Sequence, residues 1–278
     1  MHIAAVRQAE EIIGVAPLML KNETAFFMGD TDVCDYQDFI VRPARSDEFF
    51  NVLLDDLNHR SIKQLNLGAV RPDSSVQTAL INVAEARGCQ VSCNKLDISY
   101  ELELPETWDD YLLQLKGKQR HEIRRKLRRL EEAGSISYRV IEDSGGVKAE
   151  IETFFKLFKM SRNDKEIFMT AEMASFFRSL TQTLAAENML KLFFLDFNDT
   201  PAAVAICFDY ESGVYLYNNG FDIKFSSLSV GILSKVFTIK SSIRSGKQKY
   251  DFLKGAETYK HHLGGKEIPL YQCKIQLN

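Results

Sequence analysis

The chain has 278 residues, which is enough for one large domain or two domains of ordinary size, each with its own hydrophobic core. Hydrophobic residues make up 45% and charged residues 26% of the sequence, which is typical of soluble globular proteins. The 35 Lys and Arg residues against 38 Asp and Glu residues give a formal net charge of -3. This balance excludes a protein that attracts nucleic acid through its overall charge, so any site for an anion has to be local.

The sequence contains no recognisable targeting or membrane segment. Arg7, Glu10 and Glu11 interrupt the first residues, which therefore lack the layout of a signal peptide. No apolar run approaches the roughly 20 residues that a membrane span requires. The cysteines are scattered, which favours a reducing compartment; they are Cys34, Cys89, Cys93, Cys207 and Cys273. We therefore expect a cytoplasmic protein without a transmembrane segment.

A structural metal site is not expected. Cys89 and Cys93 have loose spacing, no second pair of cysteines accompanies them, and the only adjacent histidines are His261 and His262. We interpret the two cysteines as small, buried, free side chains in or near a strand.

Residues 1–106 predict an alternating α/β unit. The expected elements are a hairpin of Val15–Leu20 and Thr24–Met28, a helix from Ser46, a strand Ile62–Leu67, a helix from Ser74 or Ser75 to Ala86, and strands Cys89–Cys93 and Asp97–Leu104. The first helix has a clear apolar face, formed by Phe49, Phe50, Leu53, Leu54 and Leu57.

Residues 107–278 predict a second unit of helices and strands. Thr107 precedes a helix Trp108–Leu115, a basic helix ends at Gly134, and later elements follow in the order strand Ser137–Ile141, helices Val147–Met160 and Ala171–Glu187, strands Leu190–Phe197, Ala202–Tyr210 and Val214–Phe221, helix Leu228–Ser245, and strands Lys249–Leu253 and Pro269–Leu277. This order predicts an α/β (α+β) fold, in which a mixed, mostly antiparallel sheet is flanked by helices.

The helix expected from Leu228 begins directly after a strand, and a ligand crevice is expected there. The preceding turn contains Ser227, Ser229, Val230 and Gly231. Exposed amides at a helix start, together with the positive end of the helix dipole, bind anions such as phosphate. Ordinary capping by serine, with Gly231 retained for packing, explains the same pattern equally well.

A cluster of titratable residues follows the strand that ends near Leu253. Lys254, Glu257 and Tyr259 are residue types that acyl transfer to an amine requires: a carboxylate takes a proton, a phenol donates one, and a lysine balances negative charge. The alternative is a solvated, charged loop.

The helix expected over residues 118–133 is strongly basic. Ile123, Leu127 and Leu130 form one buried stripe, and Arg120, Arg124 and Arg128 lie outside it. These arginines are candidates for binding a phosphate-bearing substrate. The alternative is a solvated face neutralised by carboxylates elsewhere in the fold.

Four segments, taken in order, resemble one protein family. The tract Asp251–Lys260 reads "DFLKGAETYK", residues 128–134 read "RRLEEAG", residues 228–231 read "LSVG", and residues 35–36 read "DY". They are similar to segments of the CelD/Fem-like acetyltransferases of the GNAT superfamily. The usual "LSPG" of that family has valine at Val230 here.

The resemblance implies two GNAT-like halves, of which the first, residues 1–106, is abbreviated and the second, residues 107–278, carries acyl transfer. It implies acyl-CoA as the donor co-substrate, with no metal, and an amine acceptor that is a small molecule or linked to a glycan of a cell-envelope or polysaccharide pathway. Asn218 and Lys260 complete the candidate substrate-binding residues.

Two other functions remain open at this point. Fem-type relatives use aminoacyl-tRNA as the donor, in which case the basic helix would hold tRNA. The fold can also serve as a binding module without catalysis.

Overall fold

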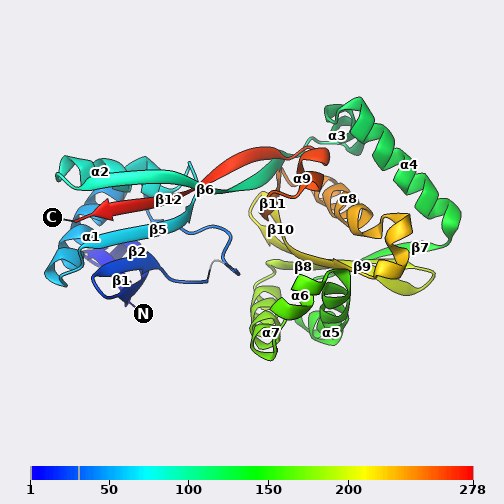
Figure 1. Ribbon diagram of the computed structural model, residues 1–278, viewed down its shortest axis with the longest axis horizontal. Coiled ribbons are helices and arrows are strands. Elements are labelled where there is room, and N and C mark those ends of the chain that lie inside the picture. The colour runs from blue at the N-terminus through cyan, green and yellow to red at the C-terminus, as the bar shows by residue number, and fades with distance from the viewer. Residues whose placement is uncertain (1, 31, 278) are drawn as a thin grey trace. The chain divides into compact units, whose positions relative to one another are not determined.

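The structure is a computed structural model that describes residues 2–30 and 32–277 (Figure 1). The chain forms two compact units. Unit 1 comprises the described residues of Met1–Ser99, Lys254–Ala256 and Glu267–Asn278, and unit 2 comprises Tyr100–Leu253 and Glu257–Lys266. The predicted division into 1–106 and 107–278 differs from this arrangement because the last strand of the chain belongs to unit 1. That strand pairs with residues about 200 positions earlier, and local sequence patterns carry no record of such pairing.

Unit 1 is built on a mixed sheet with the strand order β1-β2-β3-β5-β12-β6. The strands are β1 (His2–Gln8), β2 (Glu11–Lys21), β3 (Thr24–Phe27), β5 (Gln64–Val70), β6 (Gln90–Glu103) and β12 (Lys266–Gln276), and the short β4 (Ile40–Val41) pairs with β2. β3 and β5 are parallel, whereas β5 and β12 are antiparallel. β6 is one continuous strand where the sequence predicted two, and its last residues enter unit 2.

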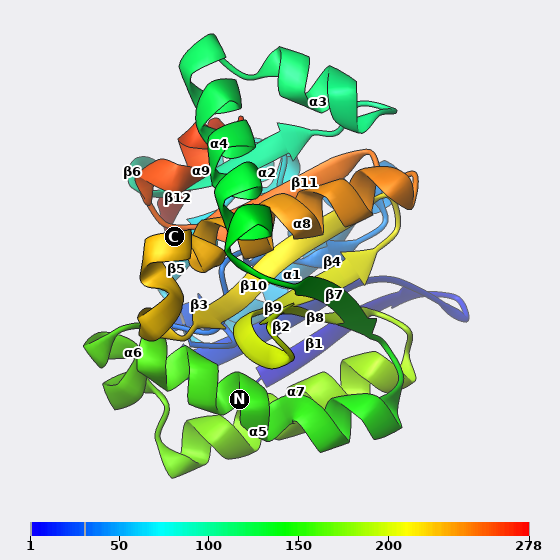
Figure 2. The ribbon, with the colours of Figure 1, turned by 90° about the vertical axis from the view of Figure 1, so that its right-hand side faces the viewer.

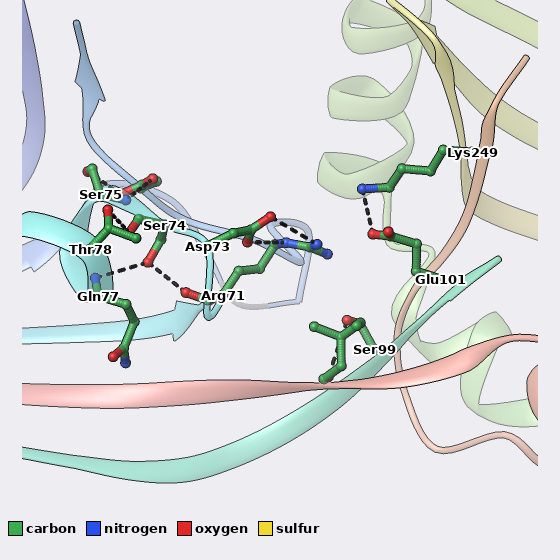
Figure 3. Close-up of polar contacts among 11 residues, drawn as sticks. Arg71, Asp73, Ser74, Ser75, Gln77, Thr78, Ser99, Glu101 and Lys249 are labelled. Atoms are coloured by element: carbon green, nitrogen blue, oxygen red, sulfur yellow. Dashed lines mark hydrogen bonds and ion pairs between the residues drawn. The ribbon is translucent and has the colours of Figure 1, made fainter. Parts of the chain in front are cut away.

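α1 (Ser46–His59) begins at Ser46 as the sequence predicts, whereas the helix predicted from Ser74 or Ser75 opens as a π-helix (Val76–Leu80) and becomes α-helical only at Ile81. The apolar face predicted for α1 is confirmed, because all five of its residues are buried. Ahead of α2 (Ile81–Ala86), the Ser74 hydroxyl donates to the carbonyl oxygen of Arg71 at 2.7 Å and accepts from the Gln77 amide at 3.3 Å (Figure 3). The neighbouring Ser75 hydroxyl donates to the Asp38 carboxylate at 2.6 Å. These bonds fix the turn that follows β5.

Cys93 and Cys273 form a disulfide between β6 and β12. The prediction that Cys93 is a free, buried thiol is therefore wrong, and the scattered cysteines do not all stay reduced in this structure. Adjacent strands of unit 1 bring the two residues together although 180 positions separate them in the chain. Cys34, Cys89 and Cys207 are free thiols.

Unit 2 contains the longer run of elements. Its helices are α3 (Trp108–Gln114), α4 (Gly117–Ala133), α5 (Ser144–Ser161), α6 (Asn163–Phe168), α7 (Ala171–Ala186), α8 (Val230–Arg244) and α9 (Thr258–His262). Its strands are β7 (Ile136–Ile141), β8 (Leu190–Phe197), β9 (Thr200–Tyr210), β10 (Gly213–Phe221) and β11 (Lys249–Lys254). The strand order β7-β8-β9-β10-β11-β6 confirms the predicted mixed, mostly antiparallel sheet. None of the helices in residues 2–30 and 32–277 has the length and apolar character that crossing a membrane demands.

The sheet of unit 2 lies between two layers of helices (Figures 1 and 2). Along β8, Leu192 and Phe194 pack with α5 and α7, whereas Phe193 and Leu195 pack with α8. This alternation follows from the two-residue period of a strand, and it explains why β8 reads as a continuous apolar run.

β10 and β11 diverge along their length. Their parallel pairing joins Gly213–Tyr215 to Lys249–Asp251, and among the described residues it ends there. β10 continues to Phe221, paired with β9 through a register shift between Leu216 and Asn218. A short 3-10 helix (Ile223–Leu228) then leads into α8, which starts at Val230, two residues after the predicted start at about Leu228. The end of β10 that is not paired with β11 therefore lies close in sequence to the first turn of α8.

Candidate active site

A cavity of about 360 Å³ lies at the opening between β10 and β11. We call it the site cavity. It is lined by Ser161, Arg162, Lys165, Asn219, Phe221, Ser226, Ser229, Gly231, Ile232, Lys235, Glu257 and Tyr259. These residues come from the junction of α5 and α6, the end of β10, the first turns of α8, and the segment that follows β11. Its volume falls in the range of small-molecule sites.

The first turn of α8 presents backbone amides at this cavity. The Ile232 and Leu233 amides donate to the carbonyl oxygen of Ser229, both at 3.0 Å. The amides of Val230 and Gly231 precede these first helical donors, so they have no partner within the helix. Ser229 adopts a left-handed conformation, with φ of 59°. Its hydroxyl accepts from the Lys126 ammonium at 3.1 Å, so a cation from α4 adds to the positive end of the α8 dipole.

Gly231 is required by packing. A Cβ atom at this position would lie 2.8 Å from Cδ1 of Phe221, which is closer than side chains tolerate. The sequence left open whether Gly231 serves phosphate binding or packing, and this contact supports packing. Ser227 is exposed in the 3-10 turn and Val230 is buried in the core, so neither side chain lines the site cavity.

Lys235 is a buried cation at the centre of the site cavity, with a side chain only 4% exposed. Its ammonium donates to the Gly231 carbonyl oxygen at 2.7 Å and to Oδ1 of Asn219 at 2.9 Å. It also lies 4.8 Å from the centre of the Tyr259 ring. Burial, reinforced by the nearby Lys165, lowers the pKa of Lys235 to about 7. The side chain therefore exchanges a proton near neutral pH.

A second, partly buried lysine comes from α6. The Lys165 ammonium donates to the carbonyl oxygen of Asn219, and it lies 4.7 Å from the centre of the Phe158 ring. Burial and the adjacent Arg162 lower the pKa of Lys165 to about 8. Arg162, Lys165 and Lys235 give the site cavity three basic groups against one carboxylate, that of Glu257.

Glu257 and Tyr259 form the opposite wall. Burial acts to raise the pKa of Glu257, but the Lys260 ammonium at 3.0 Å outweighs it and holds the pKa below its ordinary value. The Glu257 side chain is therefore ionised at neutral pH. Burial, with a further contribution from the Glu257 charge, raises the pKa of Tyr259 far above its usual range. The phenol consequently keeps its proton and can donate it.

Lys260 holds this wall in place. It is 2% exposed, and its ammonium donates to the carbonyl oxygen of Leu253 at 3.0 Å in addition to its ion pair with Glu257. In this arrangement Lys260 links the end of β11 to α9. It was predicted to bind substrate, and it reaches the site cavity only through Glu257.

Two other predicted residues do not line the site cavity. Lys254 is the last residue of β11 and belongs to unit 1. The residue before it, Leu253, has a φ of 59°, so the backbone turns there. Asn218 is absent from the lining, and its neighbour Asn219 is present. The register shift before Asn218 changes the alternation of β10, and a shift of one residue exchanges the two faces of a strand.

The predicted arginines of the basic helix lie on another face of α4. A cavity of about 500 Å³, the α4 cavity, is lined by Lys118, Gln119, Glu122, Ile123, Lys126, Ile232, Tyr259, His262 and Leu263. Lys118, Glu122 and Lys126 recur every four residues, and so do Arg120, Arg124 and Arg128. The two series are offset by two residues, or roughly 200° around a helix. The three arginines therefore face away from this cavity.

The α4 cavity and the site cavity adjoin, because Ile232 and Tyr259 line both of them. The Glu122 carboxylate accepts from Arg125 and Lys126, and these bonds lower its pKa to about 2. Figure 2 shows α4 crossing near the start of α8, which bears Ile232. Together the two cavities form a continuous path past the first turn of α8.

Sequence reasoning missed Arg162, Lys165, Asn219 and Lys235. One of them carried a detectable signal. Lys235 lies four residues after Gly231, on the apolar face of the predicted helix, and a lysine there has to be paired or functional. Lys165 and Arg162 had no such signal, because the short helix α6 was not predicted.

No group of three or more His, Cys, Asp or Glu side chains positioned to hold a metal ion occurs in the described part of the chain. The groups of the site cavity are an amine, a phenol, a carboxylate and backbone amides. Such groups perform proton transfer and bind anions.

Comparison with known families gives one clear match. Residues 117–261, which include all residues of the site cavity and most of those of the α4 cavity, match the family described as "Acetyltransferase (GNAT) domain". No match to a curated protein sequence was found.

Solved structures share the fold across nearly the whole chain. FemX superposes with a TM-score of 0.64 and 12% identity, over 98% of this chain and 87% of its own. The C-terminal domain of a protein from Agrobacterium fabrum, described as a lysylphosphatidylglycerol synthetase, gives 0.63 and 10% identity over 96% and 81%. A tandem GNAT protein from the clavulanic acid biosynthesis pathway gives 0.51 and 11% identity over 98% and 82%.

Proposed function

Because the chain belongs to the acetyltransferase (GNAT) domain family, we propose that unit 2 catalyses N-acyl transfer from acyl-CoA to an amine. One observation carries this proposal. The site cavity brings the free amides of the first turn of α8 together with a phenol that stays protonated, Tyr259, and a lysine, Lys235, that titrates near neutral pH.

The donor is anchored by its phosphates. The Gly231 amide and the Lys126 ammonium lie at the start of α8, and the dipole of this 15-residue helix adds to their positive potential. The α4 cavity, with Lys118 at its wall, provides space for the rest of the cofactor. The thioester would then reach the site cavity past Tyr259, which lines both cavities.

The reaction is a direct attack by the acceptor amine on the thioester carbonyl carbon. A C–N bond forms and the C–S bond breaks, so one proton moves from nitrogen to sulfur. We assign to the Tyr259 phenol a hydrogen bond to the leaving thiolate, which then takes up the proton that Lys235 has removed from the amine. The proton of the amine passes to Lys235 in its neutral form, since a base with a pKa of about 7 is well matched to neutral pH.

Glu257 is then not the general base that the sequence suggested. Its ion pair with Lys260 holds its pKa below the ordinary value, which makes it a weak base. We propose that it accepts a hydrogen bond from the acceptor amine and orients it.

The acceptor carries an anionic group beside its amine. The positive charges of Lys165 and of Arg162, which also pairs with Asp164, favour an anion, and they lower the pKa of a bound ammonium so that the free amine is populated. A carboxylate or phosphate held by Arg162 and Lys165 fits this arrangement. Amines of a cell-envelope or polysaccharide precursor, either small or glycan-linked, are the acceptors that we propose.

The test is release of free thiol from acetyl-CoA by the purified full-length protein, using amines in pairs that differ only in an anionic group. We expect turnover, with kcat/KM roughly tenfold or more higher for the anionic member of a pair. Tyr259→Phe should reduce kcat by about 100-fold or more, whereas Tyr210→Phe, at an exposed tyrosine, serves as the matched control. Glu257→Gln and Lys254→Ala, made separately, test the other predicted residues.

Absence of both thiol release and calorimetric binding of CoA at millimolar concentration would contradict the proposal. That result would assign the chain to the non-catalytic binding modules that share this fold.

A second candidate is transfer from aminoacyl-tRNA, as the Fem-like resemblance implies. The outer face of α4 favours it: Arg124 and Arg128 are exposed there, on the side of the helix opposite the α4 cavity. This candidate expects activity without CoA and an affinity that falls steeply with added salt.

A further inference from the structure

A third cavity of unit 2 lies along the other end of α8. Its volume is about 490 Å³, and Trp108, Tyr138, Phe237, Lys240 and Arg244 are among the residues that line it. We call it the Trp108 cavity. Phe237 and Arg244 lie 6 and 13 residues beyond Gly231, or roughly 9 and 20 Å along the helix axis. None of its lining residues is shared with the site cavity or the α4 cavity.

The walls of the Trp108 cavity are aromatic and held in place. The Tyr138 ring stacks on Phe237 at 5.3 Å and on Phe193 at 5.7 Å, between ring centres. Trp108, at the start of α3, packs on Tyr111 at 5.1 Å. Trp108, Tyr138 and Phe237 are each partly exposed, so part of each ring faces the opening. Rings fixed in this way form a prepared surface for a flat apolar group.

The rim of the Trp108 cavity is basic. Lys240 and Arg244 are one helical turn apart on α8, and both are exposed. The Lys240 ammonium lies 5.5 Å from the centre of the Trp108 ring. Among the described residues, neither cation forms an ion pair with a carboxylate, and the only acid in the lining is the exposed Glu106. Arg244 also stabilises the end of the helix dipole, but that role does not account for Lys240 above an aromatic ring.

We propose that the Trp108 cavity binds a small molecule in which a flat ring carries an anionic group. The ring packs against Trp108 and Phe237, and the anion binds Lys240 and Arg244. A nucleoside monophosphate and an aryl carboxylate share this chemistry. Because the cavity lies at the far end of α8 from the free amides, the ligand binds independently of the acyl donor.

Trp108 provides the measurement, because it is the only tryptophan in the chain. The full-length protein is titrated with AMP and with benzoate while tryptophan fluorescence is followed. Adenosine, which has the ring without the anion, and inorganic phosphate, which is the anion without the ring, serve as comparisons. We expect a saturable change with AMP, benzoate or both, and at least tenfold weaker binding of adenosine and phosphate. A response to AMP alone assigns a phosphate ligand, and a response to benzoate alone assigns a carboxylate ligand.

The double variant Lys240→Gln/Arg244→Gln should weaken the binding at least tenfold. The matched control, Lys156→Gln/Lys159→Gln, makes the same change of charge on the exposed face of α5, and it should bind normally. Thermal melts establish that both variants are folded. Saturating CoA should leave the affinity unchanged, which separates this cavity from the donor site.

Three results would overturn the proposal: no saturable fluorescence change with either anion at millimolar concentration, equal affinity in the double variant, or competition by CoA. None of these results depends on whether the protein transfers acyl groups.

Discussion

Lys235 shows how burial converts an ordinary side chain into a group that titrates near neutral pH. The ammonium is enclosed by α8, β10 and Tyr259, and its two hydrogen bonds to Gly231 and Asn219 only partly replace the lost water. The protein therefore accepts an unfavourable charge at this position. Such a cost is typical of functional sites.

The cost predicts a pH-dependent effect of Lys235→Met on stability. The pKa of Lys235 is about 7 in the folded chain against an ordinary value of 10.5. Between these values the unfolded chain holds more protons, so the wild type gains stability as pH rises through this window. The variant lacks this dependence. Relative to the wild type it should be most stable below pH 7, by on the order of a few kcal/mol at most, and the difference should shrink towards pH 10.

Urea unfolding at several pH values measures this effect, with Lys156→Met on the exposed face of α5 as the control. A difference between Lys235→Met and wild type that does not change with pH would show that Lys235 keeps its ordinary proton affinity in the folded chain.

The sequence could predict which segments line the site cavity better than it could predict the individual residues. Ser229, Gly231, Glu257 and Tyr259 were predicted, and all four line the site cavity. Asn218 was chosen over Asn219 because a register shift in β10 cannot be read from composition.

At the scale of elements, α4 presents two different basic faces. Lys118 and Lys126 line the α4 cavity, and Arg120 and Arg124 lie on the other side of the helix. Both faces read as one basic run in the sequence. Only the position of α4 against α8 distinguishes them.

Paired substitutions separate the two faces. Lys118→Gln/Lys126→Gln should raise the KM for acyl-CoA by about tenfold, since two charged contacts to the donor are lost. Arg120→Gln/Arg124→Gln changes the net charge equally and should leave this KM unchanged. Steady-state kinetics with acetyl-CoA provides the measurement. The reverse result, together with a reduced salt dependence for the arginine pair, would favour aminoacyl-tRNA as the donor.

The contact of α5 with β10 depends on a single glycine. A Cβ atom at Gly220 would lie 2.4 Å from the backbone nitrogen of Phe158 and 2.5 Å from its Cα atom, so backbone would have to move. Gly220→Ala should therefore destabilise the protein by about 1–3 kcal/mol or more.

The comparison variant is Gly117→Ala, in α4, where an added Cβ meets nothing within 4 Å. It should be neutral, or stabilising by up to about 1 kcal/mol. Urea midpoints rank the two variants, and a Gly220→Ala protein as stable as wild type would mean that α5 is not in close contact with the strand.

Long, strongly periodic elements were predictable, and short or exposed ones were not. The apolar faces of α1 and α5 and the apolar runs of β8 and β9 are buried, and that burial is what the patterns report. β1 buries only Val6, so its sequence has no apolar alternation to detect. α9 has five residues, too few to show a helical period.

At the scale of the whole molecule, the disulfide is the main covalent constraint that sequence reasoning missed. Cys93 and Cys273 lie on adjacent strands of unit 1 and close a loop of 180 residues. Cross-linking so long a loop restricts the unfolded chain strongly. The stabilisation is on the order of 4–5 kcal/mol in the chain-entropy description.

We therefore expect reduction, or the double variant Cys93→Ser/Cys273→Ser, to lower the melting temperature of the oxidised protein. Calorimetry with and without reductant tests this, after mass spectrometry has established the oxidation state. Cys34→Ser/Cys89→Ser, which removes two free thiols, is the control. Identical melting temperatures with and without reductant would show that the bond does not contribute to stability.

The position of β12 also has a consequence for biosynthesis. Nearly all of unit 2 is contiguous in the chain, but the sheet of unit 1 needs Lys266–Gln276 between β5 and β6. Nearly all of unit 2 is thus translated before β12, whereas the N-terminal strands have to wait until Lys266–Gln276 has been made. Unit 1 is therefore begun first and completed last. Until β12 is in place, the edges of β5 and β6 are open to chaperones and to mispairing.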